Sequence, residues 1–147
     1  MSNKNPVQPT RPMSLILIDT TGKTAYAPAG TVTYAPDTGD FRGIIDLGTN
    51  FVTGTYTVKV KMPKYLVKRI ATNMTITNNA INTLPAAQLT VGDIDSNNSL
   101  DITDYNAILT CLDKANTQNN CQPKRRQEVD LNDDGLDDLV IAGYFGY

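Results

Sequence analysis

The chain has 147 residues, of which 19% are charged, with 13 Lys and Arg against 15 Asp and Glu and a formal net charge of −2. It contains no His, which removes the commonest general base and the Ser–His and Cys–His pairs of hydrolases. It also contains no Trp, which counts against stacking on sugars, and no apolar run long enough to span a bilayer or form a signal peptide.

Residues 14–91 are predicted to form an all-β domain, preceded by a linker or chain end at residues 1–13. The segment Thr55–Met62 alternates polar and apolar residues strictly, which is typical of a strand with one buried face. Turn signals rich in Gly, Pro and Asn separate further short runs of strand-forming residues. These runs predict strands at Ser14–Ile18, Thr31–Ala35, Phe41–Leu47 and Met74–Thr77. Short strands at this spacing favour an antiparallel β-sandwich.

One pattern in this domain suggests a family. The run Gly54-Thr-Tyr56-Thr-Val58-Lys-Val60, followed by Pro63-Lys-Tyr65, resembles the carboxypeptidase-regulatory or transthyretin-like sandwich, in which G-x-Y-x-V-x-V precedes a P-x-Y/F turn. The resemblance covers about residues 14–91. It implies a small sandwich that forms part of a larger surface protein.

A basic cluster lies in the same domain and consists of Lys59, Lys61, Lys64, Lys68 and Arg69. A nucleic-acid surface would be larger and would carry clustered aromatic side chains. We therefore expect an ordinary solvated strand face and no nucleic-acid partner. A docking surface for the acidic second half of the chain is the alternative.

A twelve-residue stretch that starts at Asp93, called the first loop, has the ligand spacing of an EF-hand calcium loop. Oxygen-bearing residues occupy its positions 1, 3, 5, 7, 9 and 12, namely Asp93, Asp95, Asn97, Ser99, Asp101 and Asp104. A hard cation that needs six or more oxygens can be enclosed by so short a segment if alternate residues point inward and a carboxylate closes the loop. Calcium suits this ligand set better than magnesium, which demands tighter octahedral geometry.

Two positions of the first loop depart from the EF-hand pattern. Position 6, usually Gly because φ is positive there, is Asn98, the non-glycine residue that best tolerates that conformation. Position 12 is Asp104 in place of Glu, and its shorter side chain predicts weaker or more geometry-sensitive binding. The competing interpretation is a solvated turn, because Asp and Asn accept hydrogen bonds from their own backbone.

A helix is predicted directly after the first loop. Apolar residues recur at i, i+3, i+4 and i+7 from Tyr105 to Leu112, whereas no matching helix precedes Asp93, so loop and exiting helix form an F-hand. Cys111 and Cys121 are the only cysteines. They are expected to form a disulfide, because no third soft ligand exists for a metal site. A disulfide places the chain outside the cytosol.

A second acidic loop starts at Asp130, 37 residues after the first (130 minus 93). Its candidate ligands are Asp130, Asn132, Asp134, Leu136 and Asp138. Position 12 would be Ile141, whose side chain cannot bind a cation. Either about three residues have been lost and Asp138 supplies the closing carboxylate, or the loop is the shorter D-x-N-x-D-G-x-x-D type.

The two loops together resemble the type I dockerin module, over about residues 89–147. Val91-Gly92-Asp93 opens the first unit and Val129-Asp130 the second, and Tyr105–Leu109 follows the first loop. The resemblance implies a calcium-folded adaptor that binds a cohesin-like partner. Ile102 and Thr103 occupy the loop positions that help to select the cohesin partner in this family. A Ser-Thr type pair is common at these positions, and this chain differs from it, so the resemblance does not imply which partner is bound.

The charge is divided between the two halves of the chain. Residues 1–92 carry nine Lys and Arg and four Asp and Glu, a net charge of +5, whereas residues 93–147 carry four and eleven, a net charge of −7. Cations bound in the loops would relieve the repulsion within the second half. Metal is therefore expected to supply much of its folding free energy.

These observations predict a non-catalytic, extracellular or cell-surface calcium-binding adaptor of two modules. A β-sandwich at residues 14–91 is followed by a small α-helical calcium-loop module, dockerin-like and EF-hand-like, at residues 92–147. Two Ca²⁺ ions, a cohesin-like partner and no direct membrane insertion are expected. The alternatives are a calcium-stabilised structural module of a surface or adhesion protein without a cohesin partner, and a glycan-binding accessory domain.

Overall fold

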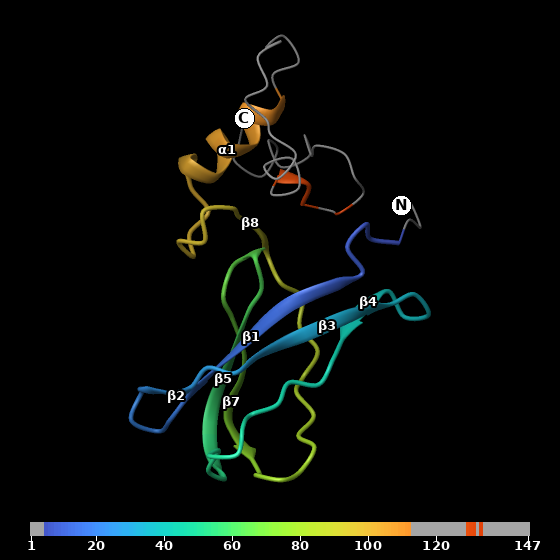
Figure 1. Ribbon diagram of the computed structural model, residues 1–147. Coiled ribbons are helices and arrows are strands. Elements are labelled where there is room, and N and C mark those ends of the chain that lie inside the picture. Colours follow the sequence, from blue (N-terminus) through green and yellow to red (C-terminus); the bar gives the residue numbers. More distant parts are fainter. Residues whose placement is uncertain (1–4, 113–128, 132, 134–147) are drawn as a thin grey trace. The chain divides into compact units, whose positions relative to one another are not determined.

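The computed structural model describes residues 5–112, 129–131 and 133 (Figure 1). The strands of this part are β1 (Thr10–Ile18), β2 (Thr24–Tyr26), β3 (Ala29–Ala35), β4 (Asp40–Arg42), β5 (Gly54–Lys61), β6 (Lys64–Tyr65), β7 (Lys68–Ile76) and β8 (Val91–Asp93), and its helix is α1 (Ile102–Leu112).

The chain divides into two compact units. The sheet unit consists of Thr10–Met62 and Val67–Leu89. The loop unit consists of Met1–Pro9, Pro63–Leu66 and Thr90–Tyr147. Of this unit, the structure describes residues 5–9, 63–66, 90–112, 129–131 and 133. The loop unit is therefore built from segments that lie far apart in the sequence.

The sheet unit is organised around one antiparallel sheet with the strand order β4-β3-β1-β5-β7 (Figure 1). The short strand β2 pairs with the C-terminal end of β1. In the register of β1 and β5, Leu15 lies opposite Val60 and Leu17 opposite Val58. Because side chains alternate along a strand, these four residues project to the same face of the sheet.

That face carries the core. The alternation predicted for residues 55–62 is confirmed, since its apolar members are buried and Val58 is fully so. The core consists of Leu15, Leu17, Phe51, Tyr56, Val58, Val60 and Ile76. Ile45, Leu47, Leu84 and Leu89, from the irregular segments after β4 and β7, pack against it.

The predicted fold class, a β-sandwich followed by a helical calcium-loop module, is wrong. The structure is mostly β, with a curled antiparallel sheet, a separate pair of strands (β6 and β8) and one short helix, and no second helical loop is seen among the residues it describes. In place of a second stacked sheet, the irregular segments named above cover the core face.

Gly43 explains part of this difference. The sequence predicts a strand from Phe41 to Leu47, but β4 ends at Arg42. A Cβ atom on Gly43 would lie 2.4 Å from the carbonyl oxygen of Thr31 in β3. The chain therefore passes closely over the backbone of β3 at Gly43, and the residues that follow pack on the core instead of extending the ladder.

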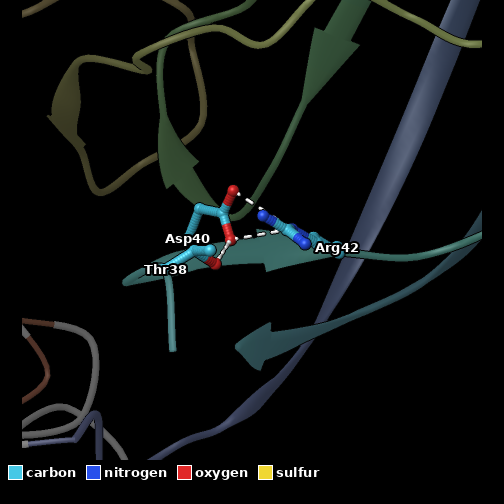
Figure 2. A network of polar contacts seen from close by, with 3 residues as sticks. All are labelled: Thr38, Asp40 and Arg42. Carbon is cyan, nitrogen blue, oxygen red and sulfur yellow. Dashed lines mark hydrogen bonds and ion pairs between the residues drawn. The ribbon is translucent and has the colours of Figure 1, made fainter. Parts of the chain in front are cut away.

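The hairpin of β3 and β4 has its own polar cluster (Figure 2). Asp40 accepts hydrogen bonds from the Thr38 hydroxyl and from Arg42 Nε, the latter at 3.0 and 3.2 Å to its two oxygens. The Thr38 hydroxyl, more than Arg42, lowers the pKa of Asp40 below its usual value of 3.8. On the same hairpin the Tyr34 and Phe41 rings lie 5.4 Å apart, so local contacts hold this edge of the sheet.

The basic cluster predicted from the sequence is divided by the structure. Lys59 and Arg69 are register partners on adjacent strands, β5 and β7. Lys68 donates a hydrogen bond to the carbonyl oxygen of Gln88 at 2.7 Å, whereas Lys64 belongs to the loop unit and donates to the carbonyl oxygen of Asp130 at 3.0 Å. Two of the lysines are thus bound to specific carbonyl groups and do not belong to a uniform solvated face.

The loop unit has a small core of its own. Ile108 of α1 packs with Val129 and Leu131, all at most 5% exposed, and the half-buried Val91, Ile94 and Cys111 contact them. Strand β8 pairs with β6, with Lys64 opposite Asp93 and Tyr65 opposite Val91. Strand pairing and a compact apolar cluster therefore hold the start of the first loop and the exiting helix.

Candidate metal centre

Gly92 brings the chain into the first loop. It is the middle residue of β8 and has a φ of 128°, which L side chains rarely adopt. A Cβ atom there would lie 3.0 Å from Leu100 Cδ2. Glycine therefore lets β8 pass close to Leu100 and place Asp93, which is fully buried, at the first position of the loop.

Within the loop, successive side chains fold back onto the backbone. The amide of Asn97 donates to Asp95 Oδ1 at 3.0 Å, and the amide of Ser99 donates to Asn97 Oδ1 at 2.7 Å. The side-chain amide of Asn97 donates to Asp95 Oδ2 at 2.9 Å and to Asp101 Oδ2 at 3.3 Å. The two Asx turns and the side-chain amide of Asn97 together gather the predicted ligands of positions 3, 5 and 9 into one hydrogen-bonded group.

Two non-glycine residues of the loop have a positive φ. The prediction for Asn98 at position 6 is confirmed, with a φ of 64°. Ser96 has the same φ and was not predicted, because Ser lacks the enrichment in this conformation that marks Asn and Asp. Both turns keep the loop tight enough for its ends to meet.

A capping box starts the helix earlier than predicted. Asp101 precedes the first helical residue, and its Oδ1 accepts a hydrogen bond from the amide of Thr103 at 2.8 Å. In return, Asp104 Oδ2 accepts from the amide of Asp101 at 3.1 Å. The helix therefore begins at Ile102 and not at Tyr105, and the sequence signal was the three-residue spacing of the two aspartates.

The same capping contact affects the charge of Asp101. The backbone amide of Thr103, followed by its side chain, lowers the pKa of Asp101 below its usual value. Asp101 therefore stays ionised to a lower pH than a free aspartate.

Two buried carboxylates close the loop. Asp104 Oδ1 accepts hydrogen bonds from the amides of Ile94 and Asp95 at 2.7 and 3.3 Å, and Asp93 Oδ1 accepts from the amide of Asn98 at 3.1 Å. Both aspartates are 0% exposed. Burying a carboxylate is costly unless hydrogen bonds or a cation compensate it, so this arrangement is one that a cation would stabilise.

The structure brings three of the six predicted ligands into one cluster. One carboxylate oxygen from each of Asp93, Asp95 and Asp104 lies within 4.8 Å of the other two. Asp95 is exposed while the other two are buried, so solvent reaches the cluster from the side of Asp95. The loop contains neither His nor Cys. Such an oxygen-only group suits hard divalent cations and does not by itself select calcium.

The second loop is described in part. Asp130, and Asp133 three residues later, are each 8% exposed. The other predicted ligands, Asn132, Asp134, Leu136 and Asp138, lie outside the described residues. A second metal site therefore stays a prediction.

Asp133 is a structural residue that the sequence analysis missed. Its φ is 57°. Its carbonyl oxygen accepts a hydrogen bond from the amide of Val7 at 2.9 Å, and its Oδ2 accepts from the amide of Gln8 at 2.7 Å. No local pattern indicates this contact, because it joins residues 125 positions apart.

Of the remaining predicted residues, Ile102 and Thr103 occupy positions 10 and 11 of the first loop, and Cys111 follows it on α1. Ile102 is 59% exposed and Thr103 is also exposed. Cys111 is half-buried against the core of the loop unit and is disulfide-bonded. Cys121 lies outside the described residues, so its pairing with Cys111 stays a prediction.

In comparisons with family models, curated proteins and solved structures, no match to this chain was found. The two family resemblances drawn from the sequence stay predictions. Within the part of the chain that the structure describes, no helix has the length and apolar character needed to cross a membrane.

Proposed function

We propose that the chain is a non-catalytic calcium-binding protein whose first loop holds one Ca²⁺ ion and thereby stabilises the loop unit. The observation that carries the proposal is the cluster of Asp93, Asp95 and Asp104, with two of the three carboxylates fully buried. Four aspartates within twelve residues repel one another, and a divalent cation relieves that repulsion.

Calcium is the favoured ion because of the number and flexibility of the ligands. The loop supplies carboxylates at four positions and an amide oxygen at Asn97, and a backbone carbonyl near position 7 completes an EF-hand set. Calcium accepts six to eight such oxygens in variable geometry, whereas magnesium retains several waters. The short Asp104 at position 12 fits the weaker affinity of extracellular calcium modules, about 10⁻⁴ to 10⁻³ M.

An extracellular or cell-surface home is part of the proposal. Calcium sites of that affinity are filled where the ion is abundant, and the bonded state of Cys111 fits an oxidising compartment. Mass spectrometry of secreted protein under non-reducing conditions tests this point. If both cysteines were free thiols in that material, Cys111 would no longer support an extracellular location.

Thermal unfolding of the full chain tests the calcium proposal. Excess chelator should lower the melting temperature, and calcium at about 100 times its Kd should restore about 2.7 kcal/mol of stability by ligand linkage. Magnesium at the same concentration serves as the control and should restore less. Melting curves that coincide in chelator and in calcium would refute a structural calcium site.

A second candidate function is the docking of a cohesin-like protein on α1. The supporting observation is the exposure of Ile102 (59%) and Leu109 (40%), which lie seven residues apart and so on the same face of the helix. This apolar pair begins at position 10 of the first loop, so calcium binding would order the helix that presents it.

Surface plasmon resonance with immobilised cohesin modules tests the second candidate. Calcium-dependent binding that Ile102→Asp abolishes is the expected result, with Val52→Asp as control because Val52 is similarly exposed (62%) but belongs to the sheet unit. Equal loss in both variants, or no binding in calcium, would leave only the structural calcium role.

A further inference from the structure

We propose that Lys64 couples the two acidic loops, so that a cation bound in the first loop also orders the start of the second. The inference rests on the proposed function, since it assigns a regulatory consequence to the same site. In this role Lys64 is a positioning residue that touches no ion itself.

Lys64 contacts the first residue of each loop. Its backbone pairs with Asp93, position 1 of the first loop, where β6 and β8 meet. Its ammonium Nζ donates a hydrogen bond at 3.0 Å to the carbonyl oxygen of Asp130, position 1 of the second loop. The residue has a φ of 70°, which a non-glycine residue adopts only where surrounding contacts compensate the strain. One residue, through its backbone and its side chain, thus joins two loops whose first residues are 37 positions apart (130 minus 93).

The second loop in turn holds the N-terminal segment. The amides of Val7 and Gln8 donate to Asp133 at 2.9 and 2.7 Å. These two amides are therefore natural reporters of order in the second loop. All of these residues belong to the loop unit.

A second link between the loops differs in kind. Ile108, which follows the first loop on α1, packs with Val129 and Leu131 beside Asp130. Apolar burial is non-directional, so this contact stabilises the unit in both ion-bound and ion-free states. The hydrogen bond from the Lys64 ammonium is directional and charge-assisted. It holds the Asp130 backbone only while β6 and β8 keep their register, and that register is what an ion on Asp93 would stabilise.

Hydrogen exchange of the full chain, followed by NMR with and without Ca²⁺, tests the coupling. In the unchanged protein, calcium should slow exchange at Ile94 and Asn98 in the first loop. It should also slow exchange at Val7 and Gln8, each on the order of tenfold, because these amides exchange through local opening of the loop unit.

Lys64→Met removes the ammonium and keeps most of the side-chain stem. In this variant calcium should still protect Ile94 and Asn98, while the calcium-dependent protection of Val7 and Gln8 disappears. Lys64→Arg, which restores a charged donor, should recover it. Lys68→Met is the matched control, because Lys68 also donates to a backbone carbonyl, that of Gln88, but within the sheet unit.

The outcomes separate the two proposals. If calcium protects no amide of the first loop, the proposed calcium site itself fails. If calcium protects the first loop but leaves Val7 and Gln8 unchanged in the unaltered protein, the site stands and the coupling is overturned. The coupling would also be overturned if calcium protected Val7 equally in Lys64→Met and in the unaltered protein. It would be overturned as well if calcium failed to protect Val7 in Lys68→Met or in Lys64→Arg.

Discussion

Asp104 is the residue on which the first loop depends most. Its carboxylate accepts hydrogen bonds from three backbone amides, those of Ile94, Asp95 and Asp101, and it belongs to the buried cluster. It therefore joins the beginning of the loop to the start of α1. We therefore expect removal of its charge to affect both loop closure and the proposed ion binding, whereas removal of an exposed aspartate in a turn should affect neither.

Asp104→Asn should weaken calcium binding by more than tenfold, a loss above about 1.4 kcal/mol, because a neutral amide replaces a closing carboxylate. Isothermal titration calorimetry measures the change. The matched control is Asp19→Asn, since Asp19 also accepts backbone amides, those of Thr21 and Lys23, but in the sheet unit. Equal affinity in the two variants would contradict the assignment of Asp104 as a ligand.

Asp40 offers a test of residue-scale electrostatics away from the loops (Figure 2). Its pKa lies below 3.8, first because of the Thr38 hydroxyl and then because of Arg42. A lowered folded-state pKa contributes stability above the unfolded value, and this contribution is lost as the pH falls through the folded value. Thr38→Val removes the hydroxyl that donates to Asp40, so NMR titration should show a higher pKa for Asp40 in this variant than in the unaltered protein. A larger rise in Arg42→Gln would mean that Arg42, and not Thr38, is the main cause.

At the scale of elements, local contacts were predictable and distant ones were not. The spacing from Asp93 to Asp104 indicated a closed loop, and the structure brings Asp93, Asp95 and Asp104 together. Asx turns at Asp95 and Asn97, each closed within two residues, shape the middle of that loop. The same local chemistry, an aspartate capping box, set the start of α1 three residues before the prediction. The segment that covers the sheet could not be predicted, because it depends on the close passage of Gly43 over Thr31.

Strand β8 gives an element-scale prediction. Gly92→Ala should destabilise the loop unit by about 1 to 3 kcal/mol, because it strains a positive φ and brings a Cβ atom to 3.0 Å from Leu100. Gly22→Ala is the matched control: Gly22 also has a positive φ of 84°, but nothing lies within 4 Å of its added Cβ. Chemical denaturation should show the smaller loss for Gly22→Ala. Equal losses would mean that the Leu100 contact has no energetic weight.

At the scale of the whole molecule, the two units are interleaved along the chain. Pro63–Leu66 belongs to the loop unit, yet it connects β5 and β7 of the sheet unit. The hydrogen bond from Lys64 to Asp130 spans 66 positions, and no sequence pattern indicated it. A boundary at residue 92, as the charge distribution suggested, would separate β8 from its partner strand β6.

A fragment of residues 92–147 should therefore bind calcium at least tenfold more weakly than the full chain, a difference of about 1.4 kcal/mol, since it lacks β6 and residues 5–9. Calorimetric titration of both proteins measures the ratio. A fragment with unchanged affinity and a cooperative melt would show that residues 92–147 fold and bind without the other two segments of the loop unit. The contacts of Lys64 with Asp130 and of Val7 and Gln8 with Asp133 would then be dispensable.

The central claim is that a calcium ion binds in the first loop, and an NMR titration of the full chain with Ca²⁺ tests it most directly. The amides of Ile94, Asn98 and Asp101 donate to the carboxylates of Asp104 and Asp93, so their resonances should shift as the ion polarises those groups. The amides of Thr21 and Lys23, which donate to Asp19, should not shift. Loop resonances that stay in place at millimolar calcium, or that shift no more than the resonances of Thr21 and Lys23, would contradict the claim.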